Sequence, residues 1–198
     1  MLMAWRDFYF SLAAAFLTAL FLLPTLINTG IYNRLPASPI VLFTLFPIVT
    51  IAGMLVASFL GRMISIFWQF AKFGLVGVLN TAIDFGILNL LIAISGVTSG
   101  IGIILINATS FSAAVLNSYF WNKDWVFSGG KKANFASFLG VTLIGLSINS
   151  LVVYALTTYV SPILVDSDKL WANFAKVLAT ALSLIWNFMG YKLVVFKR

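Results

Sequence analysis

Six long apolar stretches constrain this chain more than any other feature. They cover residues 8–27, 40–60, 71–94, 101–121, 135–157 and 171–194, and short segments rich in turn-forming residues separate them. A helix needs about 20 predominantly apolar residues to cross the hydrocarbon core of a bilayer. Because unpaired backbone groups are costly in lipid, such segments cross the membrane as helices. The sequence therefore predicts an all-α integral membrane protein with six transmembrane helices.

The composition agrees with a membrane protein and excludes several kinds of chemistry. Hydrophobic residues make up 62% of the 198, and charged residues make up only 9%. A soluble domain carries about a quarter charged residues, so lipid is the natural solvent here. The chain has no Cys and no His, and none of its acidic residues is Glu. Thiolate nucleophiles, the usual proton shuttle and most metal ligands are missing, so we expect neither an enzyme nor a bound cofactor.

The distribution of Lys and Arg predicts the orientation in the membrane. Of the 12 basic residues, three fall on one side of the predicted spans (Arg34, Lys169 and Lys176) and the other nine on the opposite side. Cytoplasmic loops carry the excess of positive charge, which places both termini in the cytoplasm and the protein in the cell membrane. The net charge of +7 then indicates contact with anionic membrane lipids, and we expect no nucleic acid partner.

The last four predicted spans resemble a tandem repeat of two helices. Residues 70–73 and 135–138 have similar sequences, and at this offset of 65 Asp84 aligns with Asn149. In the second helix of each pair, Asn117 aligns with Asn187 at an offset of 70. Chance similarity between apolar helices is the alternative interpretation. The first two spans do not join the repeat, so we predict additional helices in residues 1–65 and a four-helix domain in residues 66–198.

Asp84 is the most unusual residue inside a predicted span. It lies 12 residues, or about 18 Å of helix, beyond Lys72. Burying a carboxyl group at that depth costs roughly several kcal/mol of free energy unless the group is paired, protonated or hydrated. Gly77, Asn80 and Asp84 share one helix face at spacings of three and four residues. Asp84 is therefore a candidate for proton coupling or headgroup binding, with a packing hydrogen bond as the alternative.

Two further spans carry polar stripes on otherwise apolar helices. Small and polar positions in the fourth span include Asn107, Ser110 and Asn117, and those in the sixth include Lys176 and Asn187. Helix–helix packing in membranes uses the same residue types, so packing is the alternative for each amide. Lys176 has three interpretations: extension of its amino group to water, pairing with Asp84, or binding of an anionic phosphate.

Basic residues also follow the fourth and sixth spans. Lys123 and Lys192 each precede a Phe by four residues at the predicted inner interface. Cations at such positions anchor helix ends and attract anionic lipid. In a protein that handles lipids, they would also hold a phosphate that enters from the cytoplasmic leaflet.

Several of these motifs together resemble the GtrA-like membrane protein family. The similarity begins with the segment FAKFGLVGVLNTAID at residues 70–84, and it includes Asn117 and the NKDWVF segment at 122–127. It continues with Ala175-Lys176, the WNF segment at 186–188 and the KLVVF segment at 192–196. The resemblance covers about residues 67–197, whereas the first 60 or so residues depart from the usual four-helix pattern.

The resemblance implies a role in cell-surface polysaccharide synthesis. It implies that the chain moves a polyprenyl-phosphate-linked sugar across the cytoplasmic membrane, or that it is the membrane partner of a glycosyltransferase. Carried over residue by residue, the recurring polar positions of the family are candidates for binding this lipid-linked sugar: Asn80, Asp84, Asn117, Asn122, Lys123, Lys176, Asn187 and Lys192.

Three functions remain open from the sequence. The first is a flippase-like transporter of a polyprenyl-phosphate sugar, with the polar residues lining the path of the sugar. The second is a non-catalytic anchor or regulator of a glycosyltransferase, for which the additional helices would offer a docking surface. The third is a small proton-coupled exporter in which Asp84 exchanges the proton. The sequence also leaves open whether the protein is a monomer or a homodimer.

Overall fold

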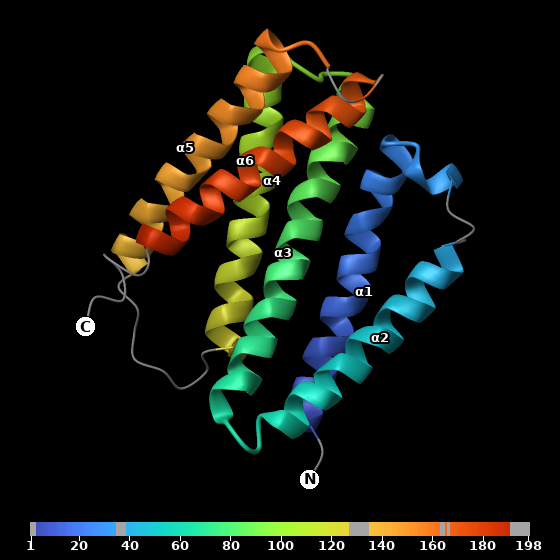
Figure 1. Cartoon of the computed structure of the whole chain (residues 1–198), viewed down its shortest axis with the longest axis vertical. Coiled ribbons are helices and arrows are strands. Elements are labelled where there is room, and N and C mark those ends of the chain that lie inside the picture. The colour runs from blue at the N-terminus through green and yellow to red at the C-terminus, as the bar shows by residue number, and fades with distance from the viewer. Residues whose placement is uncertain (1–2, 35–38, 127–134, 163–164, 166, 191–198) are drawn as a thin grey trace. The chain divides into compact units, whose positions relative to one another are not determined.

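The computed structural model describes residues 3–34, 39–126, 135–162, 165 and 167–190. Every regular element within these residues is helical, which confirms the predicted all-α class (Figure 1). In chain order the elements are α1 (Trp5–Asn28), the 3-10 turn η1 (Ile31–Arg34), α2 (Pro39–Leu60), α3 (Ser65–Ser95), α4 (Gly100–Trp121), the π-helical turn η2 (Asn122–Val126), α5 (Phe135–Tyr159) and α6 (Asp168–Gly190).

Five of the described helices are long and apolar enough to cross a membrane. Helices α1, α2, α3, α4 and α5 contain these segments, with mean hydropathies from 1.5 to 2.5. Helix α3 has 31 residues and is about 46 Å long, so its ends extend beyond a hydrocarbon core of about 30 Å. Helix α6 has 23 residues but is not one of the five, since charged and amide side chains interrupt its apolar sequence.

The turn between α3 and α4 shows how the sequence ends one helix and starts the next. Gly96 has a φ of 70°, and its N–H donates to the carbonyl oxygen of Ile92 at 2.8 Å. A residue in the left-handed region after the last turn is a common helix end, and Gly adopts this conformation without strain. Gly100 also has a φ of 70°, and its N–H donates to Oγ1 of Thr158 at 2.8 Å.

The chain forms two compact units. Unit 1 comprises residues 1–87 and 113–129, and unit 2 comprises residues 88–112 and 130–198. The boundary between them crosses α3 and α4. The predicted division into residues 1–65 and 66–198 follows from the family resemblance and stays a prediction.

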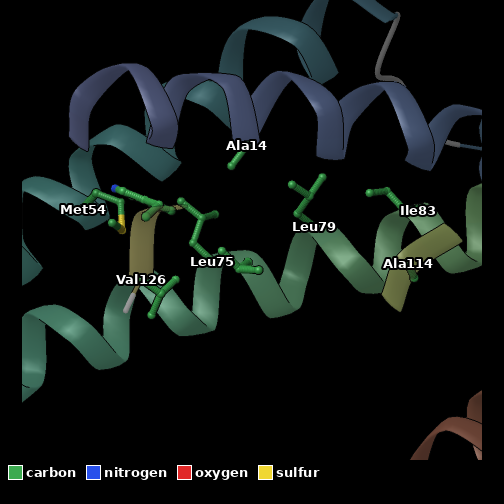
Figure 2. Packing of buried hydrophobic residues seen from close by; sticks show 9 residues of the cluster. Ala14, Met54, Leu75, Leu79, Ile83, Ala114 and Val126 are labelled. Carbon is green, nitrogen blue, oxygen red and sulfur yellow. The ribbon is translucent and has the colours of Figure 1, made fainter. Parts of the chain in front are cut away.

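The apolar core of unit 1 lies between α1 and α3. Leu75, Leu79 and Ile83 of α3 point toward α1, where Ala14 is buried (Figure 2). Met54 of α2 and residues from the end of α4 and from η2 complete this core. The three α3 positions are four residues apart, so they form one stripe along the helix.

Helix α1 presents a face of small residues in unit 1. Its buried residues are Ser11, Ala14, Ala15, Thr18 and Ala19. Small side chains let two helix backbones approach closely in a membrane. At Gly86 of α3 the approach is close, because an added Cβ atom would overlap the carbonyl oxygen of Phe21. The N-terminal helix is therefore tightly packed against α3.

Unit 2 contains a second core and the closely packed pair of α5 and α6 (Figure 1). Its buried apolar residues come from the end of α3, the start of α4, α5 and α6: Leu88, Ile92, Ile103, Val153, Ala172 and Ala179. Trp171 connects the start of α6 to the end of α5, because its indole Nε1–H is 3.0 Å from the carbonyl oxygens of both Leu156 and Val160.

Candidate functional site

The amino group of Lys176 lies inside unit 2, where the side chain is completely buried. Its Nζ donates to Oδ1 of Asn107 at 2.6 Å and to Oδ1 of Asn149 at 3.2 Å. The ring of Phe111 lies on another side, with its centroid 5.9 Å from Nζ. Extension of Lys176 to water, one of the three interpretations of the sequence, is therefore wrong for this structure. Pairing with Asp84 stays a prediction.

Three helices supply the groups around Lys176. Asn107 is on α4, Asn149 on α5 and Lys176 on α6. The amide Nδ2 of Asn107 donates to Oδ1 of Asn149 at 2.9 Å and to Oγ of Ser150 at 3.0 Å. The Nδ2 of Asn149 extends the network to Oγ of Ser183 at 3.4 Å. We call Lys176, Asn107, Asn149, Ser150 and Ser183 the lysine–amide core.

The lysine–amide core has the chemistry of a binding site for a polar, anionic group. Lys176 supplies an ammonium group, which binds a carboxylate or a phosphate more strongly than it binds a neutral acceptor. The surrounding amides and hydroxyls donate and accept hydrogen bonds, as the hydroxyls of a sugar require. Among the described residues, no group of three or more His, Cys, Asp or Glu is placed to hold a metal ion.

Unit 2 contains a second buried amide pair at the start of α6. Asn89 of α3 and Asn173 of α6 donate to each other's Oδ1 at 2.7 and 2.8 Å. Asn89 is completely buried, and Asn173 is 9% exposed. Asn89 is not among the residues predicted from the sequence, although an amide near the end of an apolar span is a usable signal.

Asn187 lies further along α6 in unit 2, against Gly145 of α5. A Cβ atom added at Gly145 would lie 2.4 Å from Oδ1 of Asn187, so only glycine leaves room for this amide. Among the described residues, Oδ1 of Asn187 and Oγ1 of Thr180 are buried without a hydrogen-bond partner. The polar stripe of α6 therefore has hydrogen-bonding capacity that its neighbours do not use.

In unit 1 the structure brings two of the predicted site residues together. Nδ2 of Asn117 on α4 donates to Oδ1 of Asn80 on α3 at 2.7 Å. Asp84, one turn beyond Asn80, is 6% exposed and is therefore buried as expected for a carboxyl group in the membrane interior. Asn122 forms a local hydrogen bond, because its Nδ2 donates to the carbonyl oxygen of Ser118, four residues earlier, at 2.8 Å.

The two basic residues at the predicted inner interface cannot be placed in the site. Lys192 and the side chain of Lys123 lie outside the described part of the structure. Their contribution to headgroup binding stays a prediction. Of the eight predicted site residues, the structure joins Asn80 to Asn117 and places Lys176 and Asn187 on the polar stripe of α6.

A charged and aromatic cluster at the helix ends of unit 1 was missed by the sequence analysis. The indole Nε1–H of Trp125 in η2 donates to Oδ1 of Asp7 in α1 at 2.7 Å. Nζ of Lys72 in α3 lies 3.9 Å from the same carboxylate oxygen. Phe10 stacks on Trp125 with ring centroids 5.4 Å apart and an interplanar angle of 10°. In the sequence each of these residues resembles an ordinary anchor at the end of a span.

Comparison with known proteins places this geometry in a family. Residues 72–196, well over half of the chain, match the family described as GtrA/DPMS, transmembrane domain. The chain is 30% identical over 128 residues to a protein of Bacillus subtilis (strain 168) named uncharacterized membrane protein YngA, covering 63% of this chain and 77% of that protein. No solved structure matches the chain. With its membrane-spanning helices it is a multi-pass membrane protein, and it belongs to the GtrA/DPMS transmembrane domain family.

Proposed function

We propose that this protein is a flippase for a polyprenyl-phosphate-linked sugar in cell-surface polysaccharide synthesis. The lysine–amide core carries the proposal, since it joins a completely buried lysine to amide side chains on helices of a membrane protein. Buried ionisable residues in membrane helices are costly and usually mark the path of a substrate or an ion. The family of the chain supports the link to polysaccharide synthesis.

The lysine–amide core suits the headgroup of such a lipid. A phosphate oxygen is a stronger acceptor for Lys176 than the amide oxygens of Asn107 and Asn149, because both partners of the new hydrogen bond are charged. The two amides released in this exchange would hydrogen-bond the sugar. The long polyprenyl tail stays in the bilayer, so only the headgroup needs a polar path. Asn80, Asp84, Asn117, Asn122, Lys123, Asn187 and Lys192 are further candidates for contacts along this path.

We further propose that α6 is the sixth transmembrane helix and that α3 to α6 form a tandem repeat. The aligned positions of the two helix pairs support the repeat. Asn80 contacts Asn117 in the first pair, and the aligned residues Gly145 and Asn187 lie against each other in the second. Gly145 stands at the position that Asn80 has in the first pair, so the second pair has no amide to bind Asn187 there.

The same proposal includes the placement of the protein in the cell. We place it in the cytoplasmic membrane with both termini inside, in contact with anionic membrane lipids and with a glycosyltransferase that supplies or uses the lipid-linked sugar. The matched family model is a transmembrane domain, and the role that we propose requires no catalysis by this chain. Residues 66–198 form the transport domain in this proposal, and residues 1–65 are an addition to it.

Translocation is tested directly in proteoliposomes. The purified protein is reconstituted in phosphatidylcholine vesicles that contain a radiolabelled polyprenyl-phosphate hexose in both leaflets. Periodate, which does not cross the bilayer, oxidises only the sugars on the outside. We expect vesicles with the protein to lose the protected inner pool within minutes, whereas protein-free vesicles keep it. An inner pool that is equally protected in both preparations contradicts the proposal.

The exposed surface of α2 favours a second function, that of an anchor for a glycosyltransferase. This helix has a mean hydropathy of 2.5, and only 11% of its apolar segment is buried within the chain. A transferase with its own membrane helix would find a long apolar surface there. Co-purification of a glycosyltransferase with the intact protein, and its loss when Ile48→Trp and Val56→Trp alter the exposed face of α2, would support this function.

A further inference from the structure

The amino group of Lys72 in unit 1 is poorly balanced for a cation that is largely buried. Its side chain is 12% exposed, and that of Asp7 is 14% exposed. Among the described residues, the oxygen atoms near Nζ are the carbonyl oxygen of Trp125 at 3.5 Å and Oδ1 of Asp7 at 3.9 Å. A charged hydrogen bond between N and O is about 2.7–2.9 Å long. Lys72 therefore faces oxygen atoms without a short hydrogen bond to either of them.

Two aromatic rings also lie near this cation. Nζ of Lys72 lies 5.5 Å from the ring centroid of Trp68 and 5.9 Å from that of Trp125. The Trp125 side chain is completely buried, and Phe10 stacks on it. Its indole N–H therefore has a fixed direction and points at the oxygen that also faces Lys72. A fixed N–H donor beside an ammonium group is the arrangement that binds an oxyanion.

Asp7 fills this oxyanion position incompletely. Its Oδ1 is 2.7 Å from the indole nitrogen of Trp125 but 3.9 Å from Nζ of Lys72, so one carboxylate oxygen satisfies only one of the two donors. A phosphate group has three terminal oxygens and can reach both donors at hydrogen-bonding distance. It also carries more negative charge than a carboxylate.

The positions of these residues along their helices place the cluster, by our expectation, at the depth of lipid headgroups. Asp7 is in the first turn of α1, and Trp125 is in η2 after the end of α4. Lys72 lies seven residues from the start of α3, or about 10 Å along a helix that extends beyond the hydrocarbon core at its ends. Trp side chains such as Trp68 and Trp125 are typical of this interface. A lipid phosphate reaches this position from the bilayer more readily than a free phosphate does from water.

We propose that Lys72 and Trp125 form a binding site for the phosphate group of a lipid phosphomonoester, and that Asp7 is the resident anion that this phosphate displaces. The family match begins at Lys72, so a helix outside the matched residues supplies the competing anion. Asp7 would then set how tightly the site holds a headgroup. The proposal concerns binding alone and does not depend on translocation.

The indole signal of Trp125 tests this proposal in the complete protein. Protein labelled with 15N-tryptophan is prepared in dodecyl maltoside micelles, and the Trp125 resonance is identified by its loss in Trp125→Phe. Dioleoyl phosphatidic acid is then titrated into the micelles, with dioleoyl phosphatidylcholine and inorganic phosphate as separate arms. We expect a saturable shift of the Trp125 signal with phosphatidic acid and none in the other two arms. No shift with phosphatidic acid overturns the proposal, and an equal shift with inorganic phosphate overturns its assignment to lipid.

Two substitutions in the cluster should change the affinity for phosphatidic acid in opposite directions. Asp7→Asn keeps an oxygen for the Trp125 indole but removes the competing charge, so phosphatidic acid should bind about fivefold more tightly, as expected for loss of a weak ion pair. Lys72→Gln should abolish the saturable shift. Asp168→Asn, which changes an exposed acid of α6, should leave the affinity at the wild-type value. If folded Asp7→Asn binds phosphatidic acid with wild-type affinity, the phosphate does not displace Asp7. If that variant does not fold, the titration of the wild-type protein alone tests whether the phosphate binds here.

Discussion

A buried amino group in a membrane helix is stable only where other atoms replace the water that it has lost. In unit 2 the side-chain oxygens of Asn107 and Asn149 do this for Lys176, at 2.6 and 3.2 Å. An ammonium group also forms stronger hydrogen bonds to charged acceptors than to neutral ones. The proposed function uses this difference, because a phosphate oxygen would replace an amide oxygen at Lys176.

Lys176→Met tests whether the amino group acts on the substrate or only on the fold. Methionine has a similar length but no charge, and it removes a hydrogen bond to a charged group worth about 1.5–3 kcal/mol. We expect translocation in the periodate assay to fall at least about tenfold, the factor that corresponds to 1.4 kcal/mol. Lys169→Met is the matched control, because Lys169 is on the same helix but exposed.

The stability of the same variant separates the two roles. Lys176→Met loses the hydrogen bonds of the ammonium group, but it also removes the cost of burying a positive charge, and these two effects on the stability of the fold oppose each other. We therefore expect Lys176→Met to melt within a few degrees of the wild type in detergent (about 2–4 °C per kcal/mol at this chain length). Wild-type translocation by a folded Lys176→Met variant would exclude this lysine from the substrate path.

Individual polar residues could be found in the sequence, but their partners could not. Lys176 and Asn187 were candidates because charges and amides are conspicuous in apolar spans. The contact of Asn149 with Lys176 depends on how α5 is rotated about its axis, and apolar residues on every side of this helix leave that rotation undefined in the sequence. Asp7 was missed for a related reason, since an acid at the end of a span resembles a residue in contact with water.

At the scale of helices, the N-terminal α1 is more closely joined to the matched domain than the sequence indicated. Its buried face of Ser11, Ala14, Ala15, Thr18 and Ala19 has the spacing of a small-residue packing motif. This pattern was present in the sequence, but the partner helix was not identifiable. The existence of the helices followed from hydropathy alone, whereas their packing depends on individual glycines and alanines.

Gly86→Ala should weaken the packing of α1 on α3. The added Cβ atom would lie 2.2 Å from the backbone oxygen of Phe21, so the helices must move apart. Overpacking of this kind destabilises by about 1–3 kcal/mol, which we expect to lower the melting temperature in detergent by several degrees. Gly77→Ala is the matched control, because nothing lies within 4 Å of its added Cβ atom and alanine favours the helix. Equal melting temperatures for the two variants would contradict the close contact.

At the scale of the whole molecule, the counts of Lys and Arg and the number of spans predict the orientation in the membrane. Three described helices, α3, α4 and α5, separate Met63 from Ser161, and each is long and apolar enough to cross. An odd number of crossings puts these two positions on opposite sides. The excess of basic residues predicts that Met63 lies on the cytoplasmic side. The side on which the C-terminus lies then depends on α6, because the C-terminus returns to the cytoplasm only if α6 also crosses.

The absence of cysteine makes the chain a ready background for a test of this orientation, since each introduced thiol is unique. Met63 and Ser161 are exposed, so Met63→Cys and Ser161→Cys should fold normally. In intact cells a maleimide that cannot cross the membrane should label Ser161→Cys but not Met63→Cys, and permeabilised cells should label both. Arg198→Cys should behave like Met63→Cys, because α6 returns the chain to the cytoplasm in the proposed arrangement. If intact cells label Arg198→Cys as well as Ser161→Cys, α6 does not cross, and Lys176 would then lie outside any membrane path for a lipid headgroup.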